Sequence, residues 1–287
     1  MFKKKPSDAF VSIATSGVRD GISSLELSGN WSKQRSVYAQ GRIAKYTGRI
    51  AEWLEKSVEA SNFTYELRAV NRQHLAAFVA TVANIPIKSA MGFIEELQQD
   101  NCVLNHYSQA LAISQTKADP IPLWGRRLGW YALTRALKPK LIVETGVHNG
   151  LGALAFTAAL KQNATEDHHG RYIGLEVLPH FGWLLSGPYE EFGEIRYGKS
   201  LDLLSNIEGP IELFLHDSDH SVDHETSEFR AVEPKLSKNC IVMSDNTYTS
   251  PALYEFANET DRRFLHFQEI SENHFYPGAG FAAAWFG

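Results

Sequence analysis

From residue 141 on, short apolar runs alternate with helical stretches, and this alternation restricts the fold more than any other feature of the sequence. The runs are LIVE, YIGLE, EIRY, IELFLH and CIVMS, and a helical period lies between most of them. Apolar runs of this length between helices predict a parallel β-sheet with helices on its faces. Two later segments, FLHFQEI and GAGFAAAWF, predict further strands at an antiparallel edge.

The first part of the sequence has a different rhythm. Between residues 34 and 118, apolar residues recur at steps of three and four, as expected of amphipathic helices. Pro120 and Pro122 end this pattern. We therefore expect a helical extension over residues 1–118 and an α/β domain over residues 119–287. The extension is expected to form a lid, a substrate wall or an oligomer interface. The helix at 36–58 packs either on another subunit or on its own sheet.

Composition excludes several classes of protein. Of the 287 residues, 44% are hydrophobic and 21% charged, which is ordinary for a globular protein. The net charge of −5 argues against nucleic-acid binding, and no apolar run is long enough for a membrane span or a signal peptide. Cys102 and Cys240 are too few for a disulfide framework or a cysteine zinc site. We expect a cytoplasmic protein.

The stretch GEIRYGKS, residues 193–200, matches the phosphate-loop pattern G-x-x-x-x-G-K-[ST]. A phosphate loop follows an apolar strand, but the residues before Gly193 are GPYEEF. Ile195 and Tyr197 alternate with charged residues inside the supposed loop, which indicates a strand there. The sequence therefore argues against a nucleotide phosphate site at this position.

Ligands of open α/β sheets bind beyond the carboxyl ends of the strands. The expected strand ends carry Glu144, Glu176, Ser200, Asp217 and Asp245. The turn after the first strand has the glycine spacing G-x-x-x-G-x-G. The dinucleotide fingerprint requires G-x-G-x-x-G, so a nicotinamide-dependent oxidoreductase is a weaker alternative.

An E-x-G-x-x-x-G turn with an acid at the end of the next strand resembles the class I S-adenosylmethionine-dependent methyltransferases. The resemblance implies a Rossmann-like sheet and assigns cofactor-binding roles. Glu144 would receive the amino group directly or through water, Gly146 and Gly150 would admit the ligand close to the backbone, and Glu176 would hold the ribose. Ser200 would contact the adenine, and Asp217 would also line the cofactor site. The alternative is that the glycines are ordinary turn residues, Glu176 a surface acid and Ser200 part of a plain turn.

Asp217, Asp245 and Asn246 follow neighbouring strands and offer hard oxygen ligands, which suit Mg²⁺. The pattern FLHD…MSDN resembles the metal-dependent O-methyltransferases of the catechol and caffeoyl-coenzyme A type, and implies these three residues as metal ligands. The segment DSDHS is similar to DGDHS in bacterial methyltransferases that act on sugar and antibiotic hydroxyls. The resemblance covers about residues 120–287.

His220 lies three residues after Asp217, where the catechol-type enzymes place a lysine as general base. Two interpretations stay open: a general base, or a residue at a helix start that bonds a neighbouring acid. His224 and Glu225 are expected on a solvated helix face.

These patterns lead to one functional hypothesis. We expect an S-adenosylmethionine-dependent methyltransferase that uses Mg²⁺ or another divalent cation to O-methylate a small-molecule hydroxyl. The expected partners exclude nucleic acid and membranes and include a second copy of the chain, bound through the N-terminal helices. Two alternatives are a metal-independent methyltransferase and a non-catalytic binding or assembly protein on the same fold.

Overall fold

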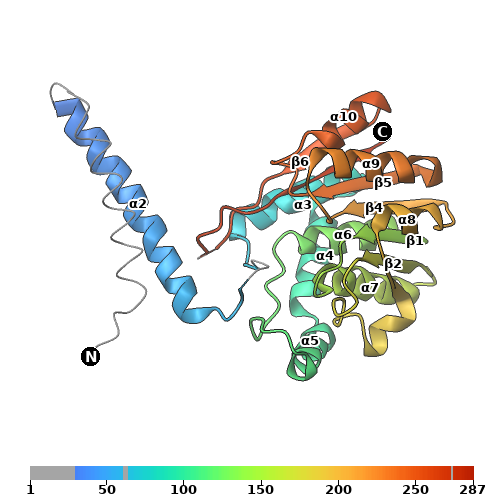
Figure 1. Ribbon diagram of the computed structural model, residues 1–287. Coiled ribbons are helices and arrows are strands. Elements are labelled where there is room, and N and C mark those ends of the chain that lie inside the picture. Colours follow the sequence, from blue (N-terminus) through green and yellow to red (C-terminus); the bar gives the residue numbers. More distant parts are fainter. Residues whose placement is uncertain (1–29, 61–63, 273) are drawn as a thin grey trace. The chain divides into compact units, whose positions relative to one another are not determined.

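The structure is a computed structural model, and it describes residues 30–60, 64–272 and 274–287 (Figure 1). The described residues belong to two compact units. The smaller unit contains helix α2 (Asn30–Lys56) and residues 274–276. The larger unit begins at Glu59 and contains every strand of the sheet.

The smaller unit is built on α2, whose aromatic residues contact the short segment around Phe275. The ring of Trp53 lies edge-on to Phe275 with 5.1 Å between centroids, and Tyr46 does the same at 6.4 Å. The prediction of a helix in this part of the sequence is confirmed. Its role as lid, substrate wall or oligomer interface stays a prediction.

The larger unit is organised around a seven-stranded sheet with the order β3-β2-β1-β4-β5-β7-β6. The strands are β1 (Leu141–Thr145), β2 (Arg171–Glu176), β3 (Gly193–Tyr197), β4 (Ile211–His216), β5 (Leu236–Asp245), β6 (Arg263–Phe267) and β7 (Phe281–Trp285). The first five are parallel, whereas β7 is antiparallel to both β5 and β6. The predicted sheet with an antiparallel C-terminal edge is confirmed.

Strand β3 occupies the first five residues of GEIRYGKS. It pairs with β2 from Tyr172↔Gly193 to Glu176↔Tyr197, so the segment is a sheet edge and not a phosphate loop. Ser200 is the first residue of helix α8 (Ser200–Ser205). The alternation of charged and apolar residues therefore predicted the structure better than the motif did.

Helices cover both faces of the sheet (Figure 1). On one face, α8, α9 (Val222–Val232) and α10 (Ala252–Glu259) bury residues such as Phe229 and Phe256 against Val143 and Phe214. The other face carries α3 (Ala69–Ala83), α6 (Arg127–Leu137) and α7 (Leu151–Ala164). Such burial of apolar area contributes about 25 cal/mol per Å² to folding.

Aromatic rings fill the second face. Phe281 on β7 contacts Phe78 of α3 and Trp130 of α6, with centroid distances of 4.9 and 6.4 Å. Trp130 also stacks on Phe156 of α7 at 5.8 Å. Phe281 therefore joins the C-terminal strand to helices from the first half of the chain.

Helices α4 (Ile87–Gln99) and α5 (Asn101–Ile113) complete the larger unit, together with the 3₁₀ helices Gly187–Phe192 and Glu233–Lys235. Because α4 packs against α3 and α6, the larger unit includes helices that the sequence analysis assigned to the extension over residues 1–118. Among the described helices, none alone is long and apolar enough to cross a membrane. Only α3 and α4 together pass this test, as a pair bent by 118°.

We predict that Phe281→Ala lowers the free energy of unfolding by about 3–5 kcal/mol, because it leaves a cavity among fully buried rings. Urea unfolding measures the change. Phe286→Ala is the matched control, since Phe286 is 43% exposed and contacts the Arg262 guanidinium at 4.2 Å, and should cost about 1 kcal/mol or less. Equal losses in the two variants would contradict the central position of Phe281.

Candidate active site at the strand ends

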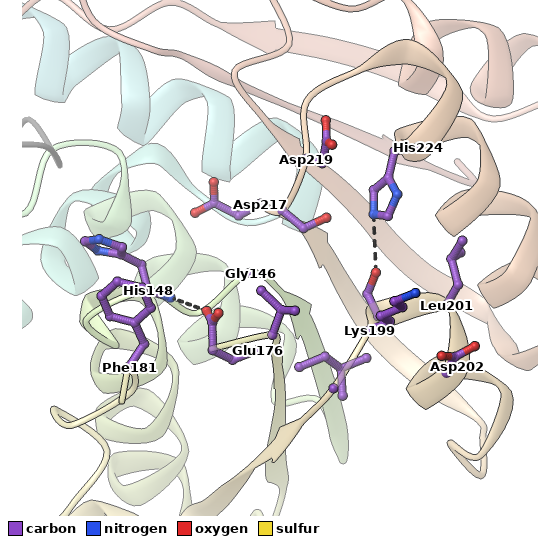
Figure 2. A pocket seen from close by; sticks show the side chains of 15 residues that line it. Gly146, His148, Glu176, Phe181, Lys199, Leu201, Asp202, Asp217, Asp219 and His224 are labelled. Atoms are coloured by element: carbon purple, nitrogen blue, oxygen red, sulfur yellow. Dashed lines mark hydrogen bonds between the residues drawn. The ribbon is translucent and has the colours of Figure 1, made fainter. Parts of the chain in front are cut away.

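A cavity of about 540 Å³ opens at the carboxyl ends of β1 to β4 (Figure 2). Its position is where chains of this topology reverse strand order, between β1 and β4. Of the predicted cofactor residues, four line it: Gly146, Glu176, Ser200 and Asp217. Glu144 and Gly150 are not among the described residues that line it.

The glycine turn brings two strand ends into direct backbone contact. Gly146 has φ +79°, and a Cβ there would lie 2.1 Å from the carbonyl oxygen of Asp217. A side chain at this position would collide with the backbone of β4, so only glycine is compatible with the turn. Gly150, with φ +92°, caps α7 and packs against Gly182 and Leu184.

Glu176 organises the same turn from the end of β2. Its Oε2 accepts hydrogen bonds from the backbone N–H groups of His148 (2.8 Å, Figure 2) and Val147 (3.0 Å), and its Oε1 accepts one from Leu178 (2.9 Å). A carboxylate accepts about four hydrogen bonds. Three are used here, so Glu176 has capacity for one further donor facing the cavity.

Glu144 is the fourth residue of β1 and is buried, with 1% of its surface exposed. The hydroxyl of Tyr172 donates a hydrogen bond to it. Gly152 makes room for it, since a Cβ there would lie 2.4 Å from Oε1. Burial raises the pKa of Glu144 to about 8, although the Tyr172 hydrogen bond and the Arg127 charge oppose the shift. Its carboxyl group is therefore largely protonated at neutral pH.

The third strand end is tied to a buried acid that the sequence analysis missed. Ser200 Oγ lies 3.3 Å from His224 Nε2, and His224 contacts Glu228 Oε1 at 2.9 Å. Glu228 also accepts from Ser218 and lies 2.7 Å from His216 Nδ1. Burial alone would raise its pKa, but the contact with His216 and its other hydrogen bonds lower it to about 2.

The prediction that Glu225 lies on a solvated face of α9 is therefore wrong. Glu225 is 1% exposed and accepts from Ser244 Oγ, and Glu228 is 0% exposed. The two acids sit at i and i+3 of the helix and bond polar residues at the ends of β4 and β5. Those polar residues inside buried strands are the signal in the sequence that pointed to partners on a helix.

A second polar cluster lies beyond β4 and β5 and shares Asp217 with the cavity. Ligand atoms of Asp217, His220 and Asp245 all lie within 4.8 Å of one another, and we call these residues the donor cluster. Asn246 Nδ2 lies 2.8 Å from His220 Nε2. The structure thus brings the three predicted metal ligands together with the predicted base. Burial lowers the pKa of His220, and burial together with Asp245 raises that of Asp217.

Arg126, which the sequence analysis did not select, lies within this cluster. Its Nη2 donates to Asp245 Oδ2 at 2.6 Å, and its Nε lies in ion-pair contact with Oδ1 without a hydrogen bond. Its Nη1 lies 3.6 Å from Glu269. Both side chains of the Arg126–Asp245 pair are buried, with 7% and 0% exposed. Burial alone would lower the pKa of Arg126, but Asp245 and Glu269 raise it well above its usual value.

The donor set does not fit a divalent cation in this arrangement. Both carboxylate oxygens of Asp245 are engaged by the guanidinium. A guanidinium 4 Å from a metal ion would oppose its binding by about 4 kcal/mol per unit of ionic charge at an effective dielectric constant of 20. Mg²⁺ also prefers oxygen ligands, whereas the cluster includes the imidazole of His220.

We predict that Glu144→Gln stabilises the protein increasingly as pH rises. Because folding raises the pKa of Glu144 from 4.5 to about 8, its stabilising contribution is complete below pH 4.5 and is lost as pH approaches 8. The neutral amide avoids this loss, which is on the order of 4 kcal/mol at pH 8.5. Urea unfolding at pH 5 and 8.5 measures the difference. A variant less stable than wild type at pH 8.5 would contradict the assignment.

We predict the opposite pH dependence for Glu228→Gln. Folding lowers the pKa of Glu228 from 4.5 to about 2, so its contribution is complete above pH 4.5 and is lost as pH falls to 2. The variant should lose about 3 kcal/mol at pH 7, and the deficit should shrink in acid. Thermal unfolding at pH 7 and pH 3 tests this. Glu255→Gln, on the exposed side of α10, should change neither value.

Comparisons with known proteins agree with this architecture. Residues 143–247 match a family model described as a methyltransferase domain. The crystal structure of cofactor-bound Rv0187 from MTB is 16% identical, with a TM-score of 0.53 over 68% of this chain and 94% of that chain. The O-methyltransferase TomG from Streptomyces achromogenes, in complex with SAM, is 17% identical, with a TM-score of 0.49 over 66% and 92%. No curated protein matches the sequence.

At such identities a structural likeness concerns the fold alone. The sheet has the mostly parallel arrangement that the resemblance implied and the antiparallel edge that the two C-terminal segments predicted. The family match begins within β1 and ends just after β5, and it therefore spans the strand ends that form the cavity and the donor cluster. Residues 143–247 thus match the model of a methyltransferase domain, and the sheet around them has the Rossmann-like methyltransferase fold.

Proposed function

We propose that this chain transfers a methyl group from S-adenosylmethionine to a hydroxyl oxygen of a small molecule. The observation that carries the proposal is the double position of Asp217. Asp217 lines the 540 Å³ cavity and also belongs to the donor cluster. A cofactor in the cavity and an acceptor beside the cluster would therefore be neighbours, as a direct transfer between them requires.

The cavity has the properties of a cofactor site. Its volume lies within the usual range of about 300–1,000 Å³ for small-molecule sites. Gly146 presents bare backbone, and Glu176 keeps capacity to accept a hydrogen bond from a ribose hydroxyl. Ser200 and Lys199 line the part beyond β3, where the adenine would lie. We propose these roles for the four residues.

The donor cluster supplies groups for the acceptor. S-adenosylmethionine, when bound, supplies an electrophilic methyl group, which the acceptor oxygen takes as it loses its proton. His220 Nε2 lies 3.7 Å from Asp217 and 2.8 Å from Asn246 Nδ2. We propose that the neutral imidazole accepts the hydroxyl proton and that Asp217 and Asn246 orient it. Mg²⁺ has no part in this proposal, because Arg126 occupies both oxygens of Asp245.

Calorimetric titration of S-adenosylmethionine and S-adenosylhomocysteine into the full chain tests the cofactor. We expect dissociation constants of about 1–100 μM, typical of a cofactor that is exchanged at every turnover. Glu176→Ala should weaken both by at least about tenfold, a loss of about 1.4 kcal/mol. Glu191→Ala, at an exposed acid that does not line the cavity, is the control and should bind as wild type does.

Absence of binding heat and of a thermal shift with both compounds would overturn the proposal and leave a non-catalytic protein on this fold. If the cofactor binds, release of S-adenosylhomocysteine can be followed with a panel of phenols, sugars and amines. Turnover with hydroxyl acceptors that His220→Ala abolishes, with cofactor affinity retained, would support the oxygen chemistry. Turnover confined to amines would contradict it.

A further inference from the structure

The donor cluster already contains a fixed cation. The Arg126 guanidinium contacts both carboxylate oxygens of Asp245: Nη2 donates a hydrogen bond to Oδ2, and Nε forms an ion pair with Oδ1. A charge-assisted hydrogen bond of this kind is stronger than one between neutral groups. The oxygens of Asp245 that a metal would need are the ones that the guanidinium binds.

The guanidinium is held in this position from its other side as well. Glu269 accepts a hydrogen bond from the Arg126 backbone N–H at 2.7 Å and lies 3.6 Å from Nη1. Glu269 in turn accepts from the Tyr65 hydroxyl at 2.7 Å and from the Gly280 N–H at 2.9 Å. Gly125 fits closely beside it, since its φ is +54° and a Cβ would lie 2.9 Å from Glu269 Oε1.

These contacts come from distant parts of the chain and are all buried. Tyr65 precedes α3, Arg126 precedes α6, Asp245 ends β5, and Glu269 follows β6. An arginine that was only a surface residue would not be enclosed by two buried acids. The arrangement is therefore a built site for one positive charge.

We propose that Arg126 takes the place of a divalent cation in this chain, so that methyl transfer proceeds without a metal. Arg126 acts as a positioning residue. It fixes Asp245 and supplies positive charge beside Asp217 and His220. The proposal rests on the proposed function for its catalytic meaning. It has a structural consequence that does not: removal of the guanidinium frees Asp245 and leaves a cluster able to bind a divalent ion.

The neighbouring Arg127 offers a matched control. It is also buried, with 5% of its surface exposed, and its guanidinium lies 5.5 Å from the ring of Trp130. It forms no ion pair with Asp245 within the part of the chain that the structure describes. Loss of Arg127 removes a positive charge from the same region without releasing the oxygens of Asp245.

The experiment is a titration of Mn²⁺ alone, followed by electron paramagnetic resonance, into the full chain and its Arg126→Gln and Arg127→Gln variants. We expect wild type and Arg127→Gln to bind no Mn²⁺ at about 1 mM. Arg126→Gln should bind Mn²⁺ with a dissociation constant at least about tenfold below that concentration. Asp245→Asn added to Arg126→Gln should abolish this binding. Binding of S-adenosylmethionine is measured on the same samples.

Mn²⁺ bound by wild type and lost in Asp245→Asn would overturn the proposal. So would a folded Arg126→Gln that binds no more Mn²⁺ than Arg127→Gln does.

If Arg126→Gln fails to fold, the Mn²⁺ titrations of wild type and of Arg126→Lys test the proposal instead. Lysine keeps the positive charge beside Asp245, so Mn²⁺ binding should stay absent, and its appearance would contradict the proposal. Failure of all samples to bind S-adenosylmethionine would remove the proposed function, and the Mn²⁺ titration would still decide the role of Arg126.

Discussion

The candidate site depends on one close approach of two backbones. The carbonyl of Asp217 occupies the space that a side chain at Gly146 would fill. This contact sets the glycine turn of β1 directly against the end of β4, and Glu176 then holds the turn in place through Val147 and His148. Because the turn lines the cavity and Asp217 belongs to the donor cluster, the contact also fixes the distance between the two halves of the site.

Buried acids support this arrangement in two different ways. Glu228 stays ionised because it accepts hydrogen bonds from strand ends, and its pKa falls to about 2. Glu144 has one side-chain donor among the described residues, Tyr172, and burial raises its pKa to about 8. Burial penalises both carboxylates, so the number and charge of their partners decide which one keeps its proton. Two buried carboxyl groups, Glu144 on β1 and Glu228 on α9, are therefore in opposite protonation states at neutral pH.

The sequence predicted the fold and the strand-end residues, because apolar period and turn glycines are local signals. Asp217, Asp245 and Asn246 were correctly expected to lie together, since parallel strands end at one edge. Arg126 was missed because its partner Asp245 lies 119 residues away, and no local pattern marks such a pair. The role of α9 was misjudged for a related reason. A polar helix face looks the same in sequence whether water or buried strand ends receive its charges.

The trio of Arg126, Asp245 and Glu269 has a consequence for how this protein evolves. Loss of Arg126 leaves two buried acids without the cation they share, and such an uncompensated charge typically costs about 3–5 kcal/mol, a large part of the stability of a domain. A single substitution of Arg126 is therefore costly, even where the altered site would work. Replacement of Arg126 by a bound metal would therefore require either a second substitution in the trio or binding of the ion as soon as the guanidinium is lost. The three residues of such a site are therefore expected to change together.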